Sequence, residues 1–350
     1  MAPAAPKAVG RAKTAGGRAR PGAVALVGGG LLVLVAVVSL MVGSDRIDGP
    51  ATVLRALSGQ ADQMLVAAVR DVRLPRTLVA ALIGAGLAVA GALIQAITRN
   101  PIVEPSTIGV NAGAALGVCL VSFFGGVTAI EVAGVDLMPF VAFAGAAVAV
   151  VLVFAFVGTG RATPGRIALA GVTVALLANA LVMSTIILND AATRYLIRFL
   201  VGGVDGVTWG GFTTLTPYVA IGLVGSFLMA RAVTVLSLGD DVAHGLGLPV
   251  RRTRLLGVGI VVVLAGAAVA VAGPISMVGL MVPHAARFLV GTDYRRILPV
   301  SALLGALLLV AADVVSRLLV RGTEIPVGVL TAVLGTPYFI YLARQGRSAV

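Results

Sequence analysis

The sequence is dominated by long apolar runs that carry no charged residue. The clearest covers residues 77–98, in which no Asp, Glu, Lys or Arg occurs and Gln95 is the only amide. As a helix rising about 1.5 Å per residue, this run would extend about 33 Å, enough to cross a hydrocarbon core of about 30 Å. A chain built from such runs is expected to fold in a lipid bilayer.

A short turn follows this run. Arg99-Asn100-Pro101 ends it, and a second apolar run begins a few residues later. Pro101 and Pro105 each restrict the residue before them, so Asn100 and Glu104 are expected to be extended rather than helical. The sequence therefore predicts a membrane hairpin with a short turn held by prolines.

The apolar runs together predict an all-α polytopic membrane protein. The run at 255–286 is long and is broken at Gly273-Pro274, where proline removes a backbone donor and clashes in a helix interior, so we count it as two helices. The composition agrees, with 59% hydrophobic and 11% charged residues against about 45–50% and 25% in soluble domains. We expect ten transmembrane helices, from the charge-free runs 21–44, 77–98, 105–130, 137–160, 167–189, 206–230, 255–286, 297–312 and 325–343.

Basic residues lie mainly between these runs and at the chain ends. The formal net charge of +12 could in other contexts indicate nucleic acid, but here the positive residues are better interpreted as topology signals, since Lys and Arg concentrate on the cytoplasmic side. An even number of helices puts both termini on one side. We therefore expect a multi-pass protein of a bacterial cytoplasmic membrane with both termini cytoplasmic, and no nucleic-acid partner.

The domain organisation is expected to be simple. Residues 1–22 combine Lys and Arg with Ala, Gly and Pro and contain no acid, a composition typical of a disordered segment. The first apolar run is too long for a signal peptide and lacks an obvious cleavage site, so we expect it to be retained. Residues 23–345 would form one ten-helix transmembrane domain, and residues 346–350 a cytoplasmic tail.

The sequence lacks the reactive groups of an enzyme. His244 and His284 lie far apart with no HExxH pattern, and neither lysine sits in a phosphate-binding GxxxxGK[ST] loop. Asp313 is the one acid expected inside a membrane helix, and Arg317 stands four residues later, the favourable spacing and order for an ion pair. We favour a local ion pair near the outer end of the ninth helix over a proton relay.

Three long segments are more specific than any of these patterns. They are residues 73–117, 273–317 and 324–342, which begin RLPRTLV, GPISMVG and EIPVGVL. In this order they resemble the permease subunits of the ABC importers for ferric siderophores and cobalamin, and the likeness covers roughly residues 50–345. The resemblance implies ten transmembrane helices with short coupling and gating helices between them.

This resemblance also implies a function. The chain would be a non-catalytic permease for an iron(III)–siderophore chelate, with haem or cobalamin as alternative cargoes, and would hold no cofactor, because ATP is bound by the partner subunit. The implied partners are two ATP-binding subunits, an extracytoplasmic substrate-binding lipoprotein and a second permease subunit, identical or related. A secondary transporter driven by an ion gradient is the alternative from a different class, and it would require intramembrane carboxylates or discontinuous helices.

The family contacts its ATPase between helices six and seven, which corresponds here to residues 236–256. The residues independently predict a short helix: Gly239 breaks the preceding one, Asp240 and Asp241 suit a positive helix N-terminus, and Gly247 with Pro249 ends it. The alternative interpretation is an ordinary basic loop that anchors the topology. The expected coupling residues are Gly239, Asp240, Asp241, His244, Leu246 and Gly247.

The resemblance assigns two further sets of residues. Docking of the binding protein is expected at Arg55, Arg317 and Arg321. The pathway is expected along the fifth and tenth helices, where Thr173, Leu177, Ala180 and Ser184 share one helical face, although that face could instead pack against a neighbouring helix. Gate residues are expected at Thr163, before the fifth helix, and at Gly202 and Gly203 after it.

Overall fold

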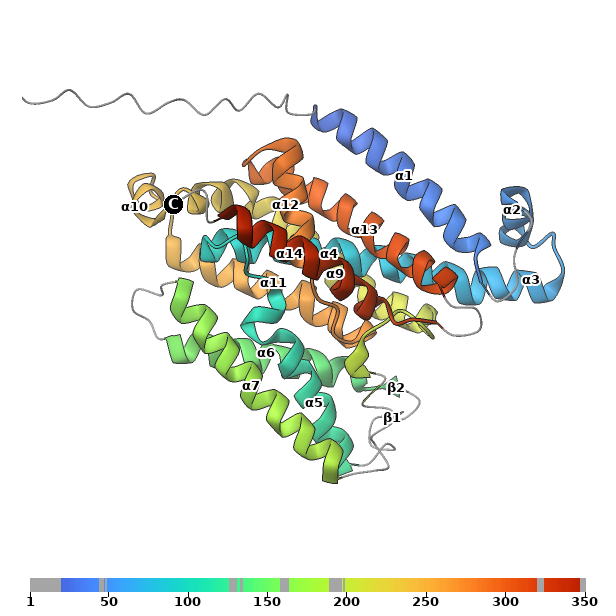
Figure 1. Ribbon diagram of the computed structural model, residues 1–350, viewed down its shortest axis with the longest axis horizontal. Helices are drawn as coiled ribbons and strands as arrows, with labels where there is room; N and C mark the ends of the chain where they lie inside the picture. The colour runs from blue at the N-terminus through green and yellow to red at the C-terminus, as the bar shows by residue number, and fades with distance from the viewer. Residues whose placement is uncertain are drawn as a thin grey trace, which may run out of the picture.

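The computed structural model of the chain describes residues 20–43, 47, 49–125, 131–132, 135–157, 164–188, 197, 199–319 and 324–346. Most of the helices run along the long axis of the molecule, several of them tilted to it (Figure 1). Their order is α1 (Pro21–Met41), α2 (Pro50–Ser58), α3 (Gln63–Ala67), a π-helical turn (Ala68–Arg73), α4 (Leu74–Thr98), a 3-10 helix (Pro105–Ile108), α5 (Val110–Gly125), α6 (Met138–Val157), α7 (Pro164–Leu188), α9 (Trp209–Ser237), α10 (Asp240–Gly245), α11 (Val250–Ala272), α12 (Val278–Val290), α13 (Tyr294–Leu319) and α14 (Val327–Gly346). Between α5 and α6, the two-residue strands β1 (Glu131–Val132) and β2 (Val135–Asp136) pair antiparallel.

The described helices match the ten predicted spans. Seven helical segments are long and apolar enough to cross a membrane, and three shorter apolar helices fall on the remaining predicted spans, at Val110–Phe124, Val278–Val290 and Val327–Ile340. The predicted break at Gly273-Pro274 is confirmed, because α11 ends at Ala272 and α12 begins only at Val278. The fold class predicted from the apolar runs is therefore correct.

Helix α4 forms the centre of the bundle and packs against α9, α11, α12 and α13. Its glycines allow backbones to approach closely: a Cβ atom at Gly84 would lie 2.1 Å from the carbonyl oxygen of Gly305, and one at Gly91 would lie 1.9 Å from that of Gly279. Small residues drive this kind of packing in membranes, where lipid gives no hydrophobic force between helices. α4 is consequently enclosed by protein along most of its length.

The predicted hairpin is only partly correct. Glu104 is extended as expected, with φ −129° and ψ 167°, and the chain does turn after α4. However, α5 packs against α6 and α7 instead of folding back along α4. The prolines determine the local direction of the chain, whereas the glycine-lined contact between α5 and α6 determines the partner: a Cβ atom at Gly113 would lie 2.5 Å from the carbonyl oxygen of Gly145.

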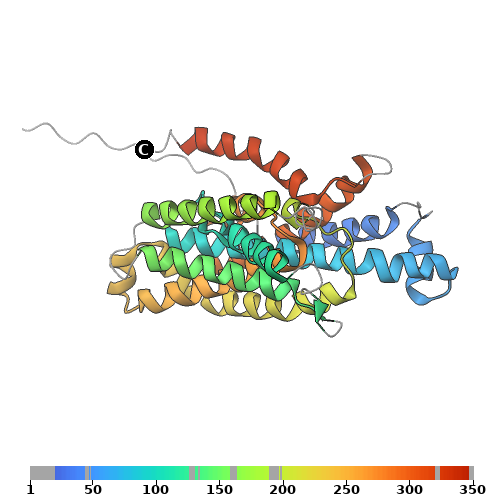
Figure 2. The same cartoon turned by 90° about the horizontal axis from the view of Figure 1, so that it is seen from below.

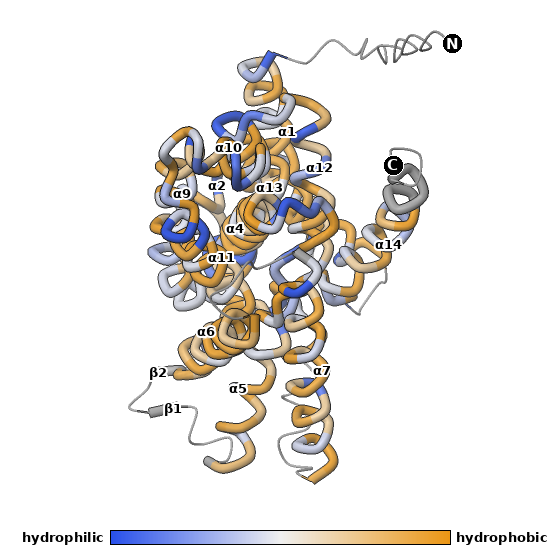
Figure 3. Tube along the Cα trace, turned by 90° about the vertical axis from the view of Figure 1, so that its left-hand side faces the viewer, coloured by the Kyte–Doolittle hydropathy of each residue, from blue (hydrophilic) through white to orange (hydrophobic). Residues whose placement is uncertain are grey.

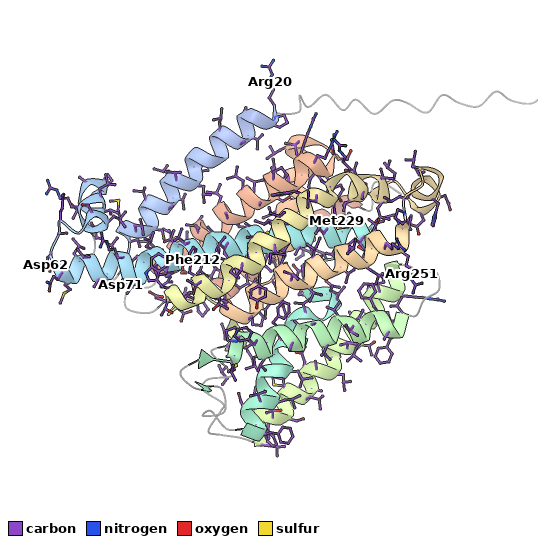
Figure 4. All side chains as sticks on the ribbon, turned by 180° about the vertical axis from the view of Figure 1, so that it is seen from behind. Arg20, Asp62, Asp71, Phe212, Met229 and Arg251 are labelled. Carbon is purple, nitrogen blue, oxygen red and sulfur yellow. The ribbon has the colours of Figure 1, made fainter. Side chains whose placement is uncertain are left out.

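The molecule has two distinct ends. Asp62 and Asp71 mark the end formed by α2 and α3, and Arg251 marks the opposite end, beside α10 (Figure 4). The tube in Figure 3 is hydrophobic along most of the helices, and hydrophilic residues gather around α10. We refer to these as the α2–α3 end and the α10 end.

Candidate transport site

The carboxylate of Asp240 links helix α10 to the rest of the bundle. Asp240, in its first turn, accepts hydrogen bonds from Nη2 of Arg254 at 2.7 and 3.0 Å, and Arg254 belongs to α11. Arg99, which ends α4 in a left-handed conformation with φ 50°, places its Nη2 3.5 Å from the same carboxylate. Asp240 therefore joins α10 to two long helices.

The rest of α10 faces outward. Ala243 is buried, whereas Asp241, Val242, His244 and Leu246 are exposed, and Leu246 is 66% exposed. Gly239 (φ 120°) precedes the helix and Gly247 (φ 75°) follows it, so both glycines occupy conformations that other residues rarely adopt. The predicted short helix is thus present, and its exposed apolar and charged side chains could meet a partner protein.

A buried ionic cluster lies near the α2–α3 end. Asp313 of α13 is fully buried, and its two oxygens lie 2.7 Å from Nη2 of Arg317 and 2.7 Å from Nη2 of Arg76, on α4. Arg76 also places Nη1 2.8 Å from Glu324. The predicted Asp313–Arg317 pair is confirmed, but sequence spacing did not reveal Arg76 or Glu324, because they lie far from Asp313 in the chain.

The structure also shows where the predicted docking arginines lie. The side chain of Arg317 is 4% exposed, and beyond Asp313 it donates to the carbonyl oxygens of Ser39 and Val42, at 2.9 and 2.7 Å, which holds the end of α1. In this conformation it cannot reach a carboxylate on another protein. Arg55 on α2 is exposed, and Arg321 lies outside the described residues.

The predicted pathway residues of α7 lie together on one face. Thr173, Leu177, Ala180 and Ser184 are all exposed, and the two hydroxyls donate to carbonyl oxygens of their own helix, at 2.9 Å each. The opposite face of α7 packs against α5 and α6. Among the described parts of the chain, no helix therefore covers the predicted face, and it presents apolar and small groups. Thr163 lies outside the described residues.

The predicted gate glycines belong to a junction of three backbone segments. Gly202 (φ 68°) leaves no room for a Cβ atom, which would lie 2.1 Å from the carbonyl oxygen of Pro274. The amide of Gly203 donates to the carbonyl of Ala272 at 2.8 Å, and the amide of Gly328, on α14, donates to that of Gly202 at 3.1 Å. We call Gly202, Gly273 and Gly328 the glycine junction.

An open groove of about 680 Å³ runs from this junction along α14. It is lined by Val201, Gly328, Val329, Ala332, Val333, Thr336 and Pro337. Helix α14 lies on the flank of the bundle (Figure 2), and seen from the α10 end it shares one side of the molecule with α7 (Figure 3). This uncharged groove and the exposed face of α7 together form a candidate pathway surface.

A buried polar contact holds the chain between α11 and α12. Met277, in a left-handed conformation with φ 73°, donates its amide to Oε2 of Glu104 at 2.9 Å. Nearby, Nε2 of Gln95 donates to the carbonyl of Gly279 at 3.2 Å. Non-helical backbone at membrane depth requires such internal partners. In the sequence, these two side chains could be noticed only because Glu104 is an acid between two prolines and Gln95 is an amide in a charge-free run.

Within the described residues, no three His, Cys, Asp or Glu side chains come together as metal ligands. The arrangement instead offers an exposed short helix at one end, a glycine junction towards the other, and an uncharged surface between them. Such a set of features suits a passage whose two ends are controlled separately.

Comparison with known proteins gives consistent matches. Residues 31–345 match the profile of the FecCD transport family. The chain is 47% identical over 280 residues to the iron(3+)-hydroxamate import system permease protein FhuB of Bacillus subtilis, covering 80% of this chain and 72% of that one. It is 42% identical to the Fe(3+)-citrate import system permease protein YfmD of the same organism, covering 83% of this chain and 84% of that one.

A cobalamin permease and a solved structure also match. The chain is 40% identical to the cobalamin import system permease protein BtuC of Halobacterium salinarum, covering 79% of this chain and 73% of that one. A solved structure described as a metal-chelate type ABC transporter in an inward-facing conformation superposes with a TM-score of 0.82 and 30% identity, covering 93% of this chain and all of that one.

Proposed function

This chain belongs to the FecCD transport family and is a permease subunit of an ABC importer, and from this premise we propose that it carries an iron(III)–siderophore chelate across the cytoplasmic membrane. Members of the family are not catalytic, and they work with separate ATPase and substrate-binding partners. The observation that carries the choice of cargo is the similarity to permeases named for iron(3+)-hydroxamate and Fe(3+)-citrate import.

The candidate pathway surface supports a bulky and weakly held cargo. The predicted pathway residues of α7 and the lining of the groove beside α14 are apolar, small or hydroxyl-bearing, without a charged group. Because a single chain covers only one side of such a passage, we propose that a second permease subunit, identical or related, supplies the other side. Thr173, Leu177, Ala180 and Ser184 would then face the cargo.

We assign the α10 end to the cytoplasm. Its basic residues, Arg251 and Arg252, are exposed beside α10, in agreement with the bias of Lys and Arg towards the cytoplasmic side. Two ATPase subunits would then each receive one α10, from this chain and from its partner permease. Movement of the ATPase would pass through Asp240 to α4 and α11.

The opposite end would receive the substrate-binding lipoprotein. Among the described residues, Arg55 is the predicted docking residue that is exposed there, whereas Arg317 is occupied inside the bundle. We therefore retain Arg55 as the proposed contact and assign Arg317 to holding α1.

The test is ATP-driven uptake by the complete transporter in proteoliposomes, supplied with its ATPase and binding protein. Uptake of a ferric hydroxamate or ferric citrate complex, dependent on ATP and absent with an ATPase-dead partner, is the expected result. Uptake that continues without ATP or ATPase would overturn the proposal.

Cobalamin is the second candidate cargo, because the cobalamin permease BtuC is 40% identical to this chain. The same vesicles should be offered cyanocobalamin in parallel. Uptake of cyanocobalamin with no uptake of ferric complexes would replace the iron assignment and leave the transporter class intact.

A further inference from the structure

Arg76 links the buried ionic cluster to Glu324, three residues before the start of α14. Its Nε and Nη2 donate to Asp313 at 3.0 and 2.7 Å, and its Nη1 donates to Glu324 at 2.8 Å. These two acceptors differ sharply in their surroundings, since the side chain of Asp313 is fully buried and that of Glu324 is 47% exposed.

This difference determines which of the two bonds can open. Separating Arg76 from Asp313 would leave the Arg76 guanidinium without its buried counter-charge, which is strongly unfavourable. Separating Arg76 from Glu324 exposes a carboxylate that is already half in solvent, and partly exposed ion pairs contribute little. The Arg76–Asp313 bond is therefore a fixed anchor, and the Arg76–Glu324 bond is the releasable one.

Glu324 stands directly before the glycine junction. Four residues later, the amide of Gly328 donates to the carbonyl of Gly202 at 3.1 Å, and a Cβ atom at Gly328 would lie 2.6 Å from the carbonyl oxygen of Val201. Because these backbones touch, α14 can move at this level only by carrying residues 201–203 with it or by breaking this contact. The ion pair that restrains Glu324 therefore also restrains the glycine junction.

We propose that the Arg76–Glu324 ion pair is a latch that keeps the glycine junction closed at the α2–α3 end, and that its release lets α14 and residues 201–203 separate. This inference rests on the proposed function and on the expected gate role of Gly202 and Gly203, by which the junction would close the pathway on the side of the binding protein. Glu324 is accordingly a positioning residue that acts on the pathway through α14.

The experiment measures access to the groove in the assembled transporter, without ATP or cargo. A single cysteine at Val333, which lines the groove and is 62% exposed in the single chain, is introduced after Cys119→Ser. A membrane-impermeant maleimide is then added on the side of the α2–α3 end. Labelling with Glu324→Gln should be about threefold faster or more, as for the loss of one partly exposed ion pair, and Glu324→Asp should give an intermediate rate.

The matched control is Asp62→Asn, which removes a carboxylate at the same end of the molecule but outside the latch. It should label at the unmodified rate. If both Glu324 variants also label at that rate, the latch proposal is overturned. Because labelling requires neither ATP nor cargo, this failure is distinguishable from a failure of the proposed function, which would appear as absent ATP-driven uptake by the unmodified transporter.

Discussion

Arg76 and Asp313, 237 residues apart in the chain, are joined by hydrogen bonds of 2.7 and 3.0 Å inside the bundle. This pair ties α4 to α13, and Arg317 extends the tie to the end of α1. The carboxylate of Asp313 therefore links α13 to α4 directly, and through Arg317 it also links them to α1. Its neighbours are protein groups, so added salt should not screen it as it screens surface charges.

Asp313→Asn should strongly destabilise the protein. The substitution removes the buried carboxylate that Arg76 and Arg317 share and leaves Arg76 only the partly exposed Glu324. Breaking a buried pair in this way typically costs about 3–5 kcal/mol. Thermal unfolding of the purified protein in detergent should show a large drop in Tm. The exposed Asp62→Asn should change stability by no more than about 0.5 kcal/mol, and equal effects of the two substitutions would contradict the assigned role of Asp313.

Asp240→Asn should separate binding of the ATPase from coupling. Leu238, Val242 and Leu246 stay exposed for contact, so the ATPase should still co-purify. Uptake should fall about tenfold, since residues in a coupling network change the coupling by about 0.5–2 kcal/mol.

Leu246→Asp is the complementary change on the same short helix. It places a charge on the exposed apolar side of α10 and leaves the Asp240–Arg254 contact intact, so co-purification of the ATPase should be lost. If Asp240→Asn lost the ATPase and Leu246→Asp kept it, the assignment of the two roles would be wrong.

Gly91→Ala should destabilise the contact between α4 and the start of α12. The added methyl would lie 1.9 Å from the carbonyl oxygen of Gly279, and overpacking of this kind costs about 1–3 kcal/mol. Gly259→Ala on α11 is the matched control, because nothing lies within 4 Å of its Cβ position. That variant should be neutral or more stable by up to about 1 kcal/mol, because alanine favours helix. Both Tm values are measured in the same detergent.

Leu177→Trp should reduce uptake several-fold without lowering Tm. The proposed pathway face of α7 would carry a larger side chain, whereas the packed face of the helix is untouched. Leu228→Trp on α9, at a position 81% exposed, serves as the control and should transport normally. Normal uptake by Leu177→Trp would place the pathway elsewhere.

Glu104→Ala should destabilise the break between α11 and α12, and Glu104→Gln should do so less. Alanine leaves the Met277 amide buried without an acceptor, which costs about 1–3 kcal/mol, whereas glutamine keeps one carboxamide oxygen able to accept. Denaturation of the two variants side by side gives the comparison. A smaller loss for alanine than for glutamine would show that the amide has another partner.

The sequence predicted those features whose cause is local. Gly273-Pro274 cannot continue a helix, and Gly239 and Gly247 bound α10 through conformations that only nearby residues determine. These features, and the number of apolar spans, follow from a few neighbouring positions. The resemblance added the expected partners and the expected coupling role of α10.

Contacts between distant segments could not be predicted in this way. The ion pair Asp313–Arg317 was found because four residues separate its members, whereas Arg76 became visible only when the fold brought α4 beside α13. The burial of Arg317 likewise depends on the end of α1, which supplies two carbonyl oxygens. The predicted hairpin was only partly correct for the same reason, since Pro101 and Pro105 do not determine which helix α5 will meet.

The central position of α4 has a consequence for biogenesis. A ribosome delivers α4 to the bilayer well before it has made α9, α11, α12 and α13, so the surfaces around Gly84 and Gly91 must first meet lipid tails. Arg76 is translated 237 codons before Asp313, its buried partner. The N-terminal half of this protein therefore reaches its mature arrangement only when the C-terminal half arrives and displaces the lipid.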